Sequence, residues 1–158
     1  YRKPKLFDTH HALGFFISPS PPIIKDAYKE VFLKISELKK FLDHQNIDLI
    51  VSIFPQRFQI SPEDWDLFVY EYGLQESCFD LLHPNKLFQS FCEKNNILCI
   101  DGTRKMQLAH SKMDSMLYQP RGDTHWNSLG NHIFFDSIRP SLNSYLEKNK
   151  DKFWTSLN

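Results

Sequence analysis

The chain has no excess of charge of either sign and no long apolar run. Its 158 residues include 19 basic and 19 acidic side chains. Binding to nucleic acid or to an anionic membrane surface needs clustered positive charge, so this balance argues against both kinds of partner. No apolar stretch approaches the roughly 18 residues that a transmembrane helix needs, so no transmembrane segment is expected.

Cysteines are few, and they provide no disulfide or metal framework. Cys78, Cys92 and Cys99 lack metal-ligand spacing, and their odd number leaves at least one thiol unpaired. Apolar residues flank each of them, which predicts buried, unreactive thiols. Hydrophobic residues make up 41% of the chain and aromatic residues 15%. This composition predicts a globular chain, with room for one domain that has its own core.

Apolar periodicity predicts several helices after an irregular lead-in over residues 1–21. From about 22 to 44, apolar residues recur at three- and four-residue spacing, as in an amphipathic helix. Ser61 and Gly73 supply the start and stop signals of another helix. The remaining predicted helices cover 84–95, 103–110 and about 127–146. Pro140 is expected to kink or break the last of these.

Two short apolar runs predict strands that are buried on both faces. They are "IDLIVSIFP" at 47–55 and the run Ile97–Ile100. Helices that alternate with such strands are typical of an α/β domain with a parallel sheet. Two strands are few for a sheet of this kind. A single domain over 1–158 is therefore expected to be incomplete at its N-terminus, with the missing strands upstream of Tyr1 or within 6–17.

The candidate site lies in "GDTHWNSLG", residues 122–130, just before the last predicted helix. Ligands of α/β folds bind at the carboxyl ends of strands, where such loops lie. On an extended loop Asp123 and His125 point the same way. The carboxylate can then orient an imidazole that takes a proton from a serine hydroxyl. For this short spacing alone, an ordinary loop with Asp123 capping a turn is the commoner explanation.

The longer string resembles the last sequence block of the SGNH (GDSL-like) hydrolases. One branch, with carbohydrate O-acetyltransferases and envelope esterases, reads Asp-x-His-Trp-Asn-x-x-Gly there, as residues 123–130 do. "LIVSIFPQRFQI" is similar to the central strand and Pro turn of that branch. "HPNKLFQSFCEKNNILCIDG" is similar to its helix–strand pair, and "LYQPRGDTHWN" to its aromatic-Pro approach. The resemblance covers roughly 22–147. It implies a three-layer α/β/α sandwich with a parallel sheet, flavodoxin-like and of the SGNH hydrolase type.

The resemblance also implies an activity and roles for individual residues. The reaction would be hydrolysis or O-acyl (acetyl) transfer of a small-molecule or carbohydrate ester, without a cofactor or metal. His125 would be the general base and Asp123 its partner. Asn127 would brace the loop or cap the helix, and Trp126 would pack beneath the site. An extracytoplasmic, cell-envelope location is favoured on the same ground. Arg57, after the first strand, is a candidate substrate contact, although a surface role is commoner.

The nucleophile is missing from the sequence. Neither the Gly-Asp-Ser block of the family nor its Gly-x-Asn-Asp block occurs, so the triad serine is expected to lie outside these residues. Two alternatives stay open. One is a catalytically silent relative that binds glycan or another protein. The other, with less support, is a metal-dependent hydrolase using Asp123, His125 and His132, with His110 as a further ligand whose position nothing fixes.

Other polar residues have simpler explanations. "FDTHHALG" at 7–14 repeats Asp-Thr-His, but it lacks Trp-Asn and no clear helix follows it. Ser18 and Ser20 lie between prolines, where a helix cap is far commoner than a strained nucleophile. Asp101 follows the second strand and is expected to cap the next helix. None of these residues is therefore predicted to be catalytic.

Overall fold

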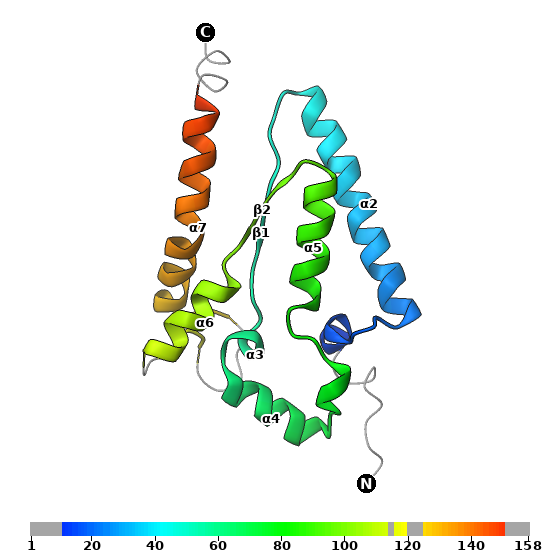
Figure 1. The fold of residues 1–158 in the computed structure, drawn as a ribbon, viewed down its shortest axis with the longest axis vertical. Helices are drawn as coiled ribbons and strands as arrows, with labels where there is room; N and C mark the ends of the chain where they lie inside the picture. Colours follow the sequence, from blue (N-terminus) through cyan, green and yellow to red (C-terminus); the bar gives the residue numbers. More distant parts are fainter. Residues whose placement is uncertain (1–10, 114–115, 120–124, 151–158) are drawn as a thin grey trace. The chain divides into compact units, whose positions relative to one another are not determined.

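The computed structural model describes residues 11–113, 116–119 and 125–150, which form two compact units. Unit 1 takes the described residues up to Val51 and then Ser61–Cys99. Unit 2 takes Ser52–Ile60 and the described residues from Ile100 onward. Figure 1 traces the chain through both units. A single domain over the whole chain stays a prediction.

The protein is a helix-dominated α/β protein with a small parallel sheet. In the described part of the chain, β1 (Ile50–Ile53) pairs with β2 (Leu98–Asp101). The sequence located both strands but overestimated their burial: every residue of β1 is partly exposed, and only Ile100 of β2 is buried. The surrounding elements therefore cover the faces of these strands only in part, and full burial on both faces was the wrong prediction.

Unit 1 contains most of the helices that the sequence predicted. The predicted ones are α2 (Pro22–His44), α4 (Pro62–Tyr72) and α5 (His83–Lys94). Two short helices that the sequence did not predict, η1 (His11–Phe16) and η2 (Glu76–Cys78), also belong to this unit. The predicted bounds of α2 are confirmed. The start and stop signals of α4 are confirmed as well. The Ser61 hydroxyl accepts a hydrogen bond from the backbone N–H of Asp64 at 3.1 Å. Gly73 ends the helix with a φ of 59°, a conformation that favours glycine.

Aromatic side chains join α2 to α5 within unit 1, where the two helices lie side by side (Figure 1). The ring of Phe32 stacks on Phe91 with centroids 4.4 Å apart and meets Phe88 edge-on at 5.1 Å. Tyr28 is buried, contacts Phe88, and donates its hydroxyl hydrogen to the carbonyl of Phe15 at 2.9 Å. These contacts fix the N-terminal half of α2 against its neighbours.

The C-terminal half of α2 is less buried than its apolar pattern predicted. Leu38 and Phe41 belong to the apolar pattern predicted for the inner face of this helix, but they are exposed. The reason is length: α2 has 23 residues, whereas α5, which packs against it, has 12. At 1.5 Å per residue, α5 spans only about half of α2.

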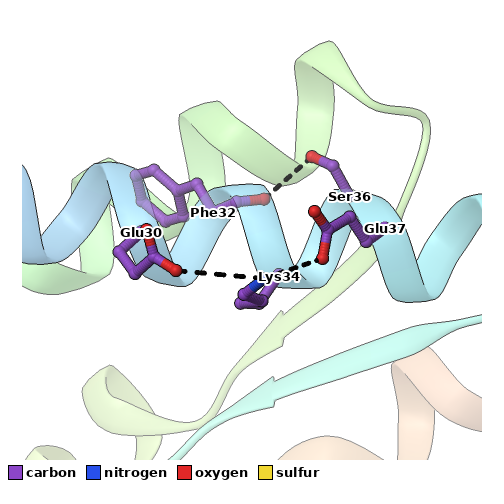
Figure 2. Close-up of polar contacts among 5 residues, drawn as sticks. All are labelled: Glu30, Phe32, Lys34, Ser36 and Glu37. Atoms are coloured by element: carbon purple, nitrogen blue, oxygen red, sulfur yellow. Dashed lines mark hydrogen bonds and ion pairs between the residues drawn. The ribbon is translucent and has the colours of Figure 1, made fainter.

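The outer face of α2 carries ion pairs between exposed side chains. Figure 2 shows Lys34 between Glu37, at 3.0 Å, and Glu30, at 4.0 Å, while the Ser36 hydroxyl donates to the carbonyl of Phe32. The hydrogen bond to Glu37 and then the charges of Glu37 and Glu30 raise the pKa of Lys34. These groups are solvated, so the pairs stabilise the helix little.

Tyr28 should make unit 1 sensitive to alkaline pH. Burial raises the pKa of Tyr28 from its usual 10 to about 12, because the fold favours the neutral phenol. The stability that this preference contributes is present below pH 10 and is lost as the pH rises from 10 toward 12. Urea unfolding between pH 8 and 12 should therefore show a shallower loss for Tyr28→Phe than for the wild type. Tyr70→Phe, at an exposed tyrosine, is the control and should leave the profile unchanged. Identical profiles for Tyr28→Phe and the wild type would contradict this account.

The three cysteines are free thiols with different surroundings. Cys92 on α5 is buried, and burial raises its pKa against the opposing effect of a hydrogen bond with Cys99. Cys78 is exposed at the end of η2, so the prediction of a buried thiol was wrong there. Its apolar neighbours in sequence did not determine its own direction, because consecutive residues of a short helical turn point to different sides.

Unit 2 contains the short helix α3 (Arg57–Ile60), α6 (Thr103–Lys112) and α7 (Ser128–Lys148). Asp101 accepts a hydrogen bond from the N–H of Thr103 at 2.9 Å in the turn before α6. The cap position of α6 is Gly102, where no side chain makes a capping bond, so the prediction that Asp101 caps the helix was wrong. Helix α7 continues through Pro140, so the break that the sequence allowed does not occur. The missing N–H removes one helical hydrogen bond, and α6 packs alongside α7.

The core of unit 2 gathers side chains from all three helices and from the segment before α7. Its buried members are Ile60, Met106, Leu117, Tyr118 and Phe134, and the half-buried Trp126, Leu129, Ile133 and Ile138 pack against them. The apolar pattern of the last helix predicts an inner face that includes Leu129, Ile133, Phe134 and Ile138. All four lie in or against this core, and Phe134 is the most buried of them. No helix in the described ranges is long and apolar enough to span a membrane.

Candidate functional site

Asn127 fixes the loop that precedes α7 with both ends of its side chain. Its Oδ1 accepts a hydrogen bond from the N–H of Gly130 at 2.9 Å, which caps the helix. Its Nδ2 donates to the carbonyl of Met116 at 2.6 Å, and its backbone N–H donates to the carbonyl of Leu117 at 3.1 Å. One residue therefore both caps α7 and ties the helix start to the segment around Leu117.

Gly130 completes this arrangement because no larger residue fits there. It is buried, and a Cβ atom added to it would lie 2.1 Å from the carbonyl oxygen of Leu117. That oxygen is the acceptor of the Asn127 N–H, so it cannot move away without losing a hydrogen bond. The Asn-x-x-Gly spacing at the end of the sequence block thus has a local structural cause. The asparagine caps α7, and the glycine lets the helix start lie close to the backbone of Leu117.

Trp126 forms an aromatic base beneath the loop. Its ring stacks on Phe54 and lies against Phe134, with centroids 5.1 and 4.6 Å away, and meets Tyr118 edge-on at 6.4 Å. The Tyr118 hydroxyl donates to the carbonyl of Pro55 at 2.9 Å in a buried position. Because Phe54 and Pro55 directly follow β1, these contacts attach the loop to the carboxyl end of that strand.

An open pocket of about 360 Å³ lies above this base within unit 2. Its described lining residues are Phe54, Pro55, Gln56, His125, Trp126 and Asn131. The volume is at the lower end of the range for small-molecule sites. The sequence predicted a site at the carboxyl ends of the strands, and the pocket occupies such a position at the end of β1.

His125 reaches this pocket as an exposed side chain on a fixed backbone. Its carbonyl accepts a hydrogen bond from the N–H of Gln119 at 2.9 Å, next to the bridge between Tyr118 and Trp126. The imidazole is thus accessible to a ligand, while its backbone carbonyl is held by Gln119. That combination is what a proton-transferring histidine needs.

The other predicted site residues have different positions. Asp123 lies outside the described residues, so its predicted pairing with His125 stays a prediction. Arg57 is not among the described lining residues of the pocket; its guanidinium donates to the carbonyl of Gln119 at 3.1 Å and so supports the loop. A role of Arg57 in binding substrate therefore has no support from this geometry.

Sequence reasoning did not find Phe54, Gln56 and Asn131. Phe54 and Gln56 flank Pro55 at the end of β1, a position from which a pocket residue could have been suspected. Asn131 follows Asn127 by four residues, and its Nδ2 donates to the Asn127 carbonyl at 3.0 Å. This spacing places both asparagines on the same side of the first turn of α7.

No group of three potential metal ligands occurs in the part of the chain that the structure describes. His132, which the metal alternative requires, instead pairs with Asp136 on α7, with Nε2 and the carboxylate 3.2 Å apart. The alternative therefore depends on Asp123, whose position is not described.

Replacing Asn127 with alanine should loosen the loop and fray the start of α7. The helix loses its cap, and the carbonyl of Met116 loses a donor, so the expected cost is about 1–3 kcal/mol. Asn127→Asp is a matched variant, because it keeps an oxygen for the Gly130 N–H but loses the donor to Met116. Urea unfolding should place Asn127→Asp between the wild type and Asn127→Ala. An alanine variant as stable as the wild type would show that these bonds do not fix the loop.

No protein-family model, curated protein or solved structure matches this chain.

Proposed function

We propose that this chain carries the general-base part of an ester hydrolase or O-acyl transferase of the SGNH type. The observation that carries the proposal is the position of His125: exposed in a pocket at the end of β1, on a loop fixed by Asn127 and Trp126. In this role the neutral imidazole takes the proton of an attacking serine hydroxyl and later returns it to the leaving group.

The proposal assigns the remaining parts of the triad as the sequence resemblance implies. Asp123 holds the imidazole in the correct tautomer and stabilises its charged form. The serine lies outside these 158 residues, because the sequence has no Gly-Asp-Ser block and no serine is among the described lining residues of the pocket. The acyl-serine intermediate is then hydrolysed by water or passed to an alcohol.

The described pocket walls favour an uncharged ester. The side chain of Phe54 is 61% exposed and presents an apolar surface, while Gln56 and Asn131 contribute amide groups. No Lys, Arg, Asp or Glu is among the described lining residues. A small-molecule or carbohydrate ester suits such a surface, since its apolar face and its hydroxyl groups would both find partners.

A binding module without catalysis is the second candidate, and the absence of a serine among the described lining residues favours it. The two candidates are separated by measuring acetate release from an acetylated glycan. The protein to assay is the full product of the gene, which contains this chain and whatever is encoded on either side of it. Turnover that survives EDTA supports the ester hydrolase or transferase. Binding of the glycan without turnover favours the binding module, and turnover that is lost with EDTA and restored by zinc favours the metal alternative.

A further inference from the structure

A second serine–histidine pair lies in unit 1, at a distance suited to proton transfer. Ser20 Oγ lies 2.7 Å from His83 Nε2. The sequence predicted that Ser20 caps α2, but that prediction was wrong, since the cap position is Pro21 and no side chain makes a capping bond there. Pro22 offers no N–H to a cap at Ser20, so the hydroxyl is available for the imidazole.

His83 is held in place by the residues around it. Its ring meets the ring of Tyr28 edge-on, with centroids 6.3 Å apart, and its backbone N–H donates to the carbonyl of Asp80 at 2.8 Å. Both contacts lie in unit 1, between α2, the turn before α5 and α5 itself. The imidazole therefore presents Nε2 to Ser20 from a constrained position.

The carboxylate of Asp80 supplies negative charge beside this histidine. It accepts a hydrogen bond from the N–H of Leu82 at 3.0 Å and pairs with Lys86 at 2.6 Å. Burial acts to raise the pKa of Asp80, but these hydrogen bonds and the charges of Lys86 and His83 outweigh it and lower the pKa. Asp80 therefore keeps its negative charge close to the imidazole.

We propose that Ser20 and His83 form a nucleophile–base pair that accepts a small acyl group from an activated ester. Ser20 Oγ forms a bond to the ester carbonyl carbon, and its proton passes to His83 Nε2. The bond from that carbon to the leaving oxygen then breaks, and the proton passes from Nε2 to this oxygen. Water, activated by the same nitrogen, hydrolyses the acyl-serine and restores Ser20.

The exposure of Ser20 limits the class of substrate. The residue is only 8% exposed, so an ester with a small acyl group such as acetyl can approach the hydroxyl more easily than one with a long acyl chain. Activated small esters, in which the leaving group departs easily, are therefore the expected donors. This inference does not rest on the function proposed for His125, which uses other residues in the other unit.

Ser61 provides a matched comparison inside the same chain. It is 6% exposed, close to Ser20, but its hydroxyl caps α4 and donates to Glu63 instead of meeting a histidine. A difference in reactivity between Ser20 and Ser61 therefore reports the imidazole and not exposure. Since Ser20 and Ser61 lie in the same chain, their rates of modification can be compared in one sample, without a variant.

The test is acylation of the intact chain by p-nitrophenyl acetate, followed by peptide mass spectrometry, with a fluorophosphonate as a second probe. Ser20 should be modified at least about 100 times faster than Ser61, in line with general-base assistance. His83→Gln keeps an acceptor for the Ser20 hydroxyl but cannot serve as a base. It should lower the rate at Ser20 about 100-fold while the melting temperature stays near that of the wild type. His132→Ala is the control histidine substitution and should not alter the rate.

Equal modification of Ser20 and Ser61 would overturn the proposal, whatever the variants show. A rate at Ser20 that does not change in folded His83→Gln would also overturn it, because reactivity would then be independent of the base. Neither result would bear on turnover that depends on His125.

Discussion

Replacing His125 with alanine should lower ester turnover about a thousandfold and leave the fold intact. The loss follows from the proposed role, since a serine hydroxyl without a base is a poor nucleophile at neutral pH. The fold should survive because His125 is exposed and the loop is fixed by its neighbours Trp126 and Asn127. The free energy of unfolding should change by less than about 0.5 kcal/mol. Two measurements give these quantities: the initial rate of acetate release from an acetylated glycan by the full product of the gene, and urea unfolding.

His132 provides the matched control for this substitution. It is another exposed histidine of unit 2, at the first turns of α7, but it pairs with Asp136 and is not among the described lining residues of the pocket. His132→Ala should keep most of the turnover. Asp123→Asn should be nearly as severe as His125→Ala, because an amide cannot stabilise the imidazolium. Equal losses in the two histidine variants would mean that the pocket is not the site of the reaction.

Replacing Gly130 with alanine should destabilise unit 2 more than any other small substitution in the loop. The new methyl group would lie 2.1 Å from the Leu117 carbonyl oxygen, which is held by the Asn127 N–H. Either the helix start or the segment around Leu117 must shift, at an expected cost of about 3 kcal/mol. Turnover should fall as well, because the same loop carries His125.

Gly73→Ala separates this clash from the general effect of removing a glycine. Gly73 has a positive φ of 59°, but an added Cβ would meet nothing within 4 Å. Its substitution should cost only about 1 kcal/mol of backbone strain. Urea unfolding should therefore rank Gly130→Ala well below Gly73→Ala in stability. The reverse order would show that the close approach of Leu117 to Gly130 is not as described.

Helix positions could be predicted well from this sequence, because their signals are local. The pattern around α2 gave its bounds, and Ser61 and Gly73 marked the ends of α4. Burial could not be predicted in the same way. Phe41 belongs to the apolar pattern of α2 but is 63% exposed, since what covers a helix face is decided by other elements. The three-layer sandwich stays a prediction, because the described residues contain two paired strands.

The candidate site was predicted in part, because only some of its residues are marked by a local sequence signal. Asp-x-His-Trp-Asn-x-x-Gly is a continuous string, so His125 and Asn127 could be found from sequence alone. Phe54 and Ser20 could not, because each acquires its meaning from a partner far along the chain: Trp126 for the former and His83 for the latter. Tertiary packing brings such residues together, and a single sequence does not show which distant residues will meet.

The most direct test of the proposed role of His125 is rescue of a His125→Gly variant by free imidazole. The variant removes the proton acceptor and leaves space in an open pocket that an imidazole molecule can enter. If His125 is the general base, added imidazole should raise acetate release from an acetylated glycan by the His125→Gly variant of the full gene product at least about tenfold over the rate of imidazole alone. It should not raise the turnover of His132→Gly. A His125→Gly variant that keeps the wild-type rate, or that stays inactive at every imidazole concentration while folded, would contradict the proposed role.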